Sequence, residues 1–198
     1  MAICAAVVMS SHVHLLLRPR DAEHLASFMC FLKTNVSKEI GRLRGWKGHV
    51  FHGRYHSTTV STEEEAQVRV LRYVLSHGPK EGLVDTVREW PGIHCAEHLV
   101  DGTALVGRRH DRTAERRARQ SDSEDGLTSR EEVRFSPLPC WEPLPESTWR
   151  RAVAEMVDEI DREAAAERRA SRKRSLGVEA VLSADPLEGP EEPARSPK

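Results

Sequence analysis

The segment His12-Val13-His14 places two imidazoles two residues apart in an otherwise apolar stretch. On a β-strand, residues i and i+2 point to the same face, so both rings would converge while Val13 packs on the other side. Neutral imidazole is a common ligand of divalent metals. The pair therefore indicates a metal site, although a polar strand end is the alternative interpretation in a chain with ten histidines.

Tyr73 and His77 lie four residues apart, which puts them on one face of a predicted helix. The Tyr73 hydroxyl can act as a nucleophile, and His77 can complete a three-histidine site with the first pair. The alternative for Tyr73 is a half-buried aromatic on the apolar stripe of Val70 and Val74. The other tyrosine, Tyr55, falls in a loop-like segment, and a reactive group is held more accurately on a rigid helix. We therefore predict Tyr73 as the nucleophile.

A strand followed by a helix must position the first histidines. Residues 2–17 are apolar, include β-branched side chains and end before Pro19. They predict one buried strand, or two short strands with a bend at the serines. Residues 21–43 keep one apolar face and stop before Gly45, which predicts a helix.

A second helix must position Tyr73. It is predicted to begin at Ser61, because Ser61 and Glu64 have the spacing of a capping box. It runs to residue 76 or 77, where Gly78-Pro79 would end it. Residues 48–60, which precede it, predict a loop and a short strand. This order of elements predicts an α+β fold with its sheet near the start of the chain.

Residues 31–60 carry six basic side chains against one acid, Glu39, with aromatic side chains between them. A local excess of positive charge with interleaved aromatics is typical of a surface that binds a polyanion. A solvated basic face of a helix would show the same pattern, so the charge alone does not decide between the two.

The composition of the chain excludes several classes of protein. The 198 residues include 31% charged side chains, and the mean hydropathy is −0.55. No run reaches the roughly 18–20 apolar residues of a membrane span, and the apolar first nine residues lack the basic start of a signal peptide. Four widely spaced cysteines without a C-x-x-C pair indicate free thiols in a reducing compartment. We therefore expect a cytoplasmic protein with no membrane partner.

Changes in composition divide the chain into four parts. Residues 1–100 hold the apolar runs and predict the folded catalytic domain, and residues 101–133, rich in Arg, Asp, Ser and Glu, predict a charged linker or exposed helix. Residues 134–184 predict a C-terminal helical extension, because apolar side chains recur there at helical spacing. Residues 185–198 contain four prolines and predict a disordered tail.

Several segments together resemble one known family. The stretch VMSSHVHLLLRP at residues 8–19 resembles the histidine–hydrophobe–histidine strand of the single-tyrosine (HUH) transposases. More narrowly, it resembles the REP-associated tyrosine transposases of the insertion-sequence-200-like family. GHVFHGRYHS at residues 48–57 and Arg72-Tyr73-Val74 resemble later blocks of that family in the same order, and the resemblance covers roughly residues 5–95.

The resemblance implies a ferredoxin-like domain that cuts and rejoins single-stranded DNA near hairpins. His12 and His14 would hold Mg²⁺ or Mn²⁺, His77 stands where the family carries its third ligand, and Tyr73 would form a 5′-phosphotyrosine. Basic side chains would contact phosphates, and Trp46 or Tyr55 would stack on unpaired bases. The residues expected to bind DNA are Lys33, Lys38, Arg42, Arg44, Trp46, Lys47, Arg54 and Tyr55.

The chain also departs from the family pattern. Relatives carry a strand and a helix before the histidine strand, and the resemblance finds neither here, so we expect a sheet truncated at its N-terminal side. That leaves open a second function, in which the chain is a catalytically inactive remnant that only binds DNA. A homodimer is possible with either function. A zinc hydrolase is disfavoured, because no carboxylate general base accompanies the histidine pair.

Overall fold

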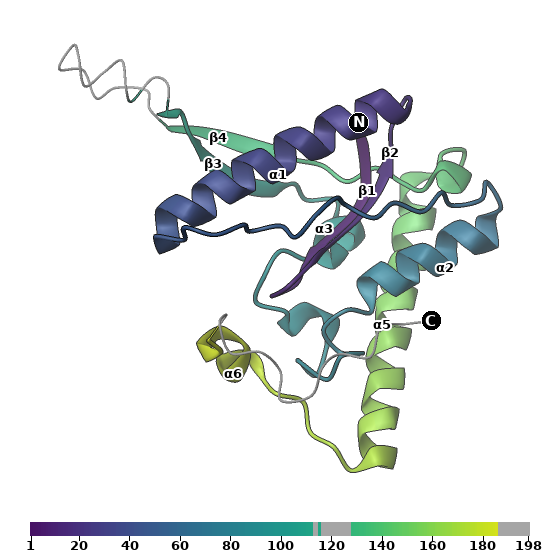
Figure 1. Cartoon of the computed structure of the whole chain (residues 1–198). Coiled ribbons are helices and arrows are strands. Elements are labelled where there is room, and N and C mark those ends of the chain that lie inside the picture. The colour runs from purple at the N-terminus through teal and green to yellow at the C-terminus, as the bar shows by residue number, and fades with distance from the viewer. Residues whose placement is uncertain (113–114, 116–127, 186–198) are drawn as a thin grey trace.

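The computed structural model describes residues 1–112, 115 and 128–185 (Figure 1). Within them it contains helices and two separate antiparallel sheets of two strands each. The α+β class predicted from the sequence is confirmed. The sheet that carries the histidines comprises β1 (Ala2–Val8) and β2 (Val13–Arg18), and the second sheet comprises β3 (Leu105–His110) and β4 (Thr128–Val133).

The first sheet is a hairpin, so the second of the two possibilities left by the apolar N-terminal stretch is the right one. Val8 pairs with Val13 and Ala2 pairs with Arg18, and the serines lie in the turn between the strands. The turn is closed by a hydrogen bond of 2.8 Å from the amide of Met9 to the carbonyl of His12. This register fixes His12 and His14 at the turn end of the sheet.

The outer edge of β1 is covered by segments from much later in the chain. The amide of Val8 donates to Ile93 O at 2.9 Å, and the amide of Cys95 donates to Ala6 O at 3.1 Å. Further along, the amide of Ser136 donates to the carbonyl of Ile3 at 2.9 Å. These bonds satisfy backbone groups that an unpaired edge would leave exposed.

The first helix, α1 (Ala22–Arg44), has the bounds that the sequence predicts, within one residue at each end. Asp21 caps it by accepting the amide of His24 at 2.7 Å, and Gly45 ends it in the left-handed conformation with φ 62°. Its apolar face is only half-buried, and no residue of α1 is fully buried.

The second helix, α2 (Glu64–Leu75), begins three residues later than predicted, and the expected capping box does not form. The carboxylate of Glu64 accepts a hydrogen bond from the indole of Trp141 at 3.1 Å instead of reaching back to Ser61. Gln67 anchors the start of the helix by donating to Thr62 O at 2.8 Å. The short strand predicted within residues 48–60 is also absent, and this segment is an extended loop in the structure.

The sequence predicts a charged linker or exposed helix for residues 101–133. In the structure, the two strands of the second sheet occupy both ends of this segment. Its strands are almost wholly exposed, so they lack the alternating apolar side chains that reveal a strand in a sequence. Because charged side chains replace that apolar alternation, the sequence does not reveal these two strands. The tail prediction for residues 186–198 lies outside the described residues.

The C-terminal extension contributes eight of the 21 buried residues of one shared core. Its main helix, α5 (Glu146–Ser171), buries five apolar side chains against the body of the protein: Trp149, Val153, Met156, Val157 and Ile160. Smaller elements complete this region, namely η1 (Val87–Glu89), α3 (Ala96–Asp101), η2 (Pro139–Trp141) and α6 (Val178–Ser183). Because buried residues of β1, α2, α3 and α5 form one cluster, residues 134–184 are part of the same folded unit as the hairpin. Among the described helices, none combines the length and the hydropathy that crossing a membrane requires.

Replacing Trp149 with alanine tests this shared core. Trp149 is 5% exposed, and its loss leaves a cavity that should lower the free energy of unfolding by about 3–5 kcal/mol. Chemical denaturation followed by circular dichroism should show one transition that moves to lower denaturant. Trp46→Ala, at a 38% exposed tryptophan, is the matched control with a small effect. A second, unshifted transition in Trp149→Ala would contradict a single core.

Candidate functional site

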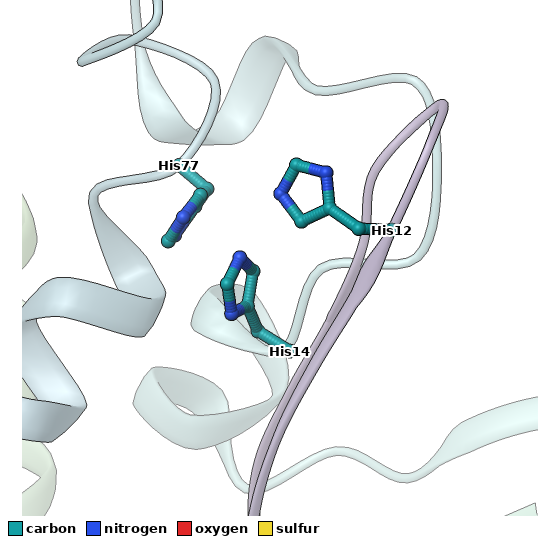
Figure 2. Close-up of side chains that lie close together, drawn as sticks. All are labelled: His12, His14 and His77. Atoms are coloured by element: carbon teal, nitrogen blue, oxygen red, sulfur yellow. The ribbon is translucent and has the colours of Figure 1, made fainter. Parts of the chain in front are cut away.

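Three imidazoles meet where the β1–β2 hairpin approaches the end of α2. His12 lies in the hairpin turn, His14 lies on β2, and His77 lies in the turn after α2 (Figure 2). One nitrogen from each ring can be chosen so that all three lie within 4.8 Å of one another. The structure therefore brings together the three histidines that the sequence predicted as metal ligands.

The three rings lie close together with their planes at different angles. The ring centres of His14 and His77 are 3.9 Å apart, and those of His12 and His14 are 4.7 Å apart. The rings of His12 and His77 are 5.9 Å apart with an angle of 72° between their planes. His12 is exposed, His14 is half-buried and His77 is buried, so the group opens to solvent on the side of His12.

Hydrogen bonds and burial prepare these nitrogens to bind a cation. Nδ1 of His77 lies 3.2 Å from the carbonyl of Val74, which can only accept, so Nδ1 carries the proton and Nε2 keeps its lone pair. Nε2 of His14 is buried and has no hydrogen-bond partner among the described residues. An orphaned buried nitrogen beside two further imidazoles is the donor set that a divalent metal fits.

The same burial keeps two of the rings neutral. Burial, together with the smaller effects of the neighbouring His77 and His12, lowers the pKa of His14 to about 4. Burial likewise lowers the pKa of His77. Only the neutral ring offers a lone pair, so these directions favour metal binding at neutral pH.

The turn after α2 fixes the position of His77. Gly78 adopts φ 98°, a conformation that side chains other than glycine rarely reach. An added Cβ at Gly78 would also lie 3.1 Å from the Val84 side chain. Hydrogen bonds from Lys80 N to Ser76 O at 3.1 Å, and from Leu83 N to Gly78 O at 2.9 Å, close the turn.

Tyr73 lies beside this cluster on the exposed face of α2. Its ring centre is 4.7 Å from that of His77 and 5.6 Å from that of His14, and both contacts are nearly perpendicular. Its side chain is 45% exposed, whereas Val74 and the preceding Leu71 are buried in the core. The alternative of a half-buried aromatic therefore stays open, and the role of Tyr73 as nucleophile stays a prediction.

Salt bridges connect the tyrosine helix to the C-terminal extension. Arg72, the neighbour of Tyr73, contacts Glu159 at 3.0 Å and Glu163 at 2.7 Å, both on α5. At the start of α2, the Gln67 side chain accepts the amide of Cys140 at 3.2 Å. These partially exposed contacts are individually weak, but together they orient α2 relative to the C-terminal extension.

The basic side chains predicted to bind DNA form a separate surface on α1 and the loop that follows. Lys33 Nζ donates to Gly53 O at 2.7 Å and lies 5.4 Å from the ring centre of Phe51. Lys33 and Lys38 line a hollow of about 380 Å³ together with residues 48–51. The other predicted DNA-binding residues are Arg42, which pairs with Glu39, the exposed Arg44, Trp46, Lys47 and Arg54, and the half-buried Tyr55. Within the described part of the chain, no hydrogen bond, salt bridge or ring contact joins this surface to the histidines.

Sequence reasoning missed His94, which lies at the outer edge of β1. His94 forms an antiparallel bridge with Val7, and its Nδ1 accepts the amide of Ala96 at 3.2 Å. Its Nε2 is buried without a partner among the described residues, and burial lowers the pKa of His94 to about 4. No motif surrounds His94, so only its place in the fold identifies it as a buried titratable group.

Comparison with known families finds a match for the segment that contains this site. Residues 1–77 match the family model described as "Transposase IS200 like". This segment contains the hairpin, α1, α2, and every residue of the histidine and tyrosine group. Residues 1–77 are therefore similar to the IS200-like transposase family, which is the family that the motifs resemble.

The match ends at His77, and the remainder of the chain lies outside it. Comparison with curated proteins and with solved structures finds no match. The family supports a transposase-like function with DNA as partner. The histidine group is a candidate for the metal site that such a function requires.

Acid should destabilise the protein through His94. Its pKa is about 4 in the folded chain and about 6.5 when unfolded, so the unfolded state binds more protons between these values. The free energy of unfolding should therefore fall as pH drops from 6.5 to 4, by up to about 3 kcal/mol from this group.

Denaturation in chelating buffer at several pH values measures that loss. His94→Gln should have a shallower slope between pH 6.5 and 4 than the unaltered protein, even if its stability at pH 7 is lower. Equal slopes for the two proteins would show that His94 titrates normally.

Proposed function

We propose that this protein is a single-stranded DNA transposase that cuts and rejoins DNA at hairpins through Tyr73. The observation that carries the proposal is the meeting of one half-exposed phenol with three imidazoles at distances of a few ångströms. Such a combination supplies a nucleophile and a cation site for one phosphate. The family of residues 1–77 supports the same conclusion.

The basic surface of α1 and its following loop would hold the DNA strand. Lysines and arginines there neutralise phosphates, which makes binding sequence-independent and sensitive to salt. Trp46 is 38% exposed and can stack on an unpaired base, an interaction that stabilises binding by about 1–3 kcal/mol per base. Because this surface is separate from the histidines, a bound strand would extend from α1 to the end of α2.

The reaction would be a transesterification. Tyr73 Oη forms a bond to phosphorus while the bond from phosphorus to the 3′-oxygen breaks, which leaves a 5′-phosphotyrosine and a free 3′-hydroxyl. The phenol loses its proton to solvent and the 3′-oxygen gains one, so charge and atoms balance. Because the phosphodiester energy is kept in the tyrosine ester, a second 3′-hydroxyl can be joined without ATP.

His12, His14 and His77 would hold a divalent cation, Mg²⁺ or Mn²⁺, beside the tyrosine. When bound, the ion polarises the phosphate and offsets the charge that grows on its oxygens. Three nitrogen ligands favour Mn²⁺ of the two, because Mg²⁺ prefers oxygen ligands. A DNA substrate also agrees with the cytoplasmic location expected from the free cysteines.

Trapping the covalent intermediate tests this function. Incubation with a labelled single-stranded hairpin and Mn²⁺ should give a protein–DNA adduct that Tyr73→Phe abolishes, because phenylalanine has no hydroxyl to attack phosphorus. Mass spectrometry of the digested adduct should locate the nucleotide on Tyr73. The chain has only two tyrosines, so an adduct on Tyr55 would contradict the assignment. Binding of the hairpin without any adduct would support the inactive DNA-binding protein instead.

The ligand set predicts the choice of ion. Mn²⁺ should bind more tightly than Mg²⁺ by about tenfold or more, because imidazole prefers the softer ion. Isothermal titration calorimetry with each ion measures the difference. His77→Gln provides a matched control, since an amide oxygen suits Mg²⁺ and should narrow the gap between the two ions. An unchanged ratio in His77→Gln would show that His77 is not a ligand.

A further inference from the structure

Lys80 lies over the ring of Tyr73. Its Nζ is 4.8 Å from the ring centre, within the range of a cation–π contact. Lys80 is exposed, and no carboxylate among the described residues forms an ion pair with it. An ammonium with no acidic partner therefore stands beside the proposed nucleophile.

The backbone around Lys80 is well fixed. Its amide donates to Ser76 O, and the amide of Gly82 donates to Pro79 O at 3.0 Å. The C-terminal extension binds the same turn, with Leu176 N donating to Gly82 O at 2.8 Å and Gly177 N donating to Leu83 O at 2.9 Å. The long side chain of Lys80 therefore starts from a backbone position that does not depend on its contact with Tyr73.

We propose that Lys80 is a positioning residue that acts through Tyr73 by stabilising negative charge on the phenol ring. The inference rests on the proposed function and concerns the same site. As Oη attacks phosphorus and loses its proton, negative charge spreads into the ring. The attraction of the ring for the ammonium grows at that moment, so the contact favours the transition state over the resting enzyme.

The same contact acts in the rejoining direction. When the second 3′-hydroxyl attacks the phosphotyrosine, the bond from phosphorus to Oη breaks and the phenolate leaves. Lys80 lowers the barrier to that departure because it again stabilises the negative charge on the phenol ring. Cleavage and rejoining should therefore depend on Lys80 to a similar degree, which a residue that only binds DNA would not produce.

Lys80→Met keeps the length of the side chain and removes its charge. In single-turnover reactions with a hairpin and Mn²⁺, the rate of adduct formation should fall about 5- to 30-fold, with unchanged DNA affinity. Lys80→Arg should restore most of the rate, because it restores the cation. Lys173→Met, at an exposed lysine in the C-terminal extension, is the matched control and should react like the unaltered protein.

A substrate with sulfur in place of the bridging 3′-oxygen separates two roles for Lys80. Sulfur leaves readily without help, so a defect at the leaving group would disappear with this substrate. A defect at the nucleophile would persist, and we expect Lys80→Met to remain slow. Recovery of the full rate would overturn the inference and place Lys80 at the leaving group.

A measurement without DNA checks the contact itself. The two tyrosine rings can be followed by carbon–proton NMR and assigned with Tyr73→Phe. Lys80→Met should shift the ring signals of Tyr73 and leave those of Tyr55 in place, and unshifted Tyr73 signals would overturn the inference. A full rate of adduct formation in Lys80→Met would overturn this inference alone, whereas the absence of any adduct in the unaltered protein would overturn the proposed function and this inference with it.

Discussion

The placement of α2 between the hairpin and α5 is the constraint on which the site depends. The apolar side of α2 packs into the shared core through Leu71 and Leu75, which leaves Tyr73 on the side of the helix that faces solvent. The turn that follows brings His77 under the hairpin. The hairpin and the turn after α2, which are far apart in the sequence, thereby hold the ring centres of His14 and His77 3.9 Å apart.

Burial at this junction has a chemical as well as a structural effect. Imidazoles placed in a packed junction lose their affinity for protons, as the lowered pKa of His14 and of His77 indicates. A neutral ring without a hydrogen-bond partner is costly unless a ligand engages it. The packing that orders α2 therefore also keeps these imidazoles neutral, which is the state in which a ring nitrogen offers a lone pair.

Much of this arrangement could be predicted from the sequence, because the informative residues are close together along the chain. The spacing of His12 and His14 and that of Tyr73 and His77 are local patterns that predict neighbouring side chains. The prediction of proximity is right even though His12 and His77 lie in turns just outside β2 and α2. Long-range contacts could not be predicted in this way. The contact of Glu64 with Trp141, which replaces the capping box, and the bridge of Val7 to His94 join residues that no spacing rule connects.

The hydrogen bonds along the outer edge of β1 have a consequence for the order in which the molecule folds. Strand β1 receives its edge partners, residues 93–95 and 136, only after the long segment between them has been synthesised. Contacts of such long sequence separation form slowly, since the entropy of closing the loop must be overcome first. The hairpin that carries His12 and His14 is therefore translated before its edge partners and completes its surroundings only after they have been made.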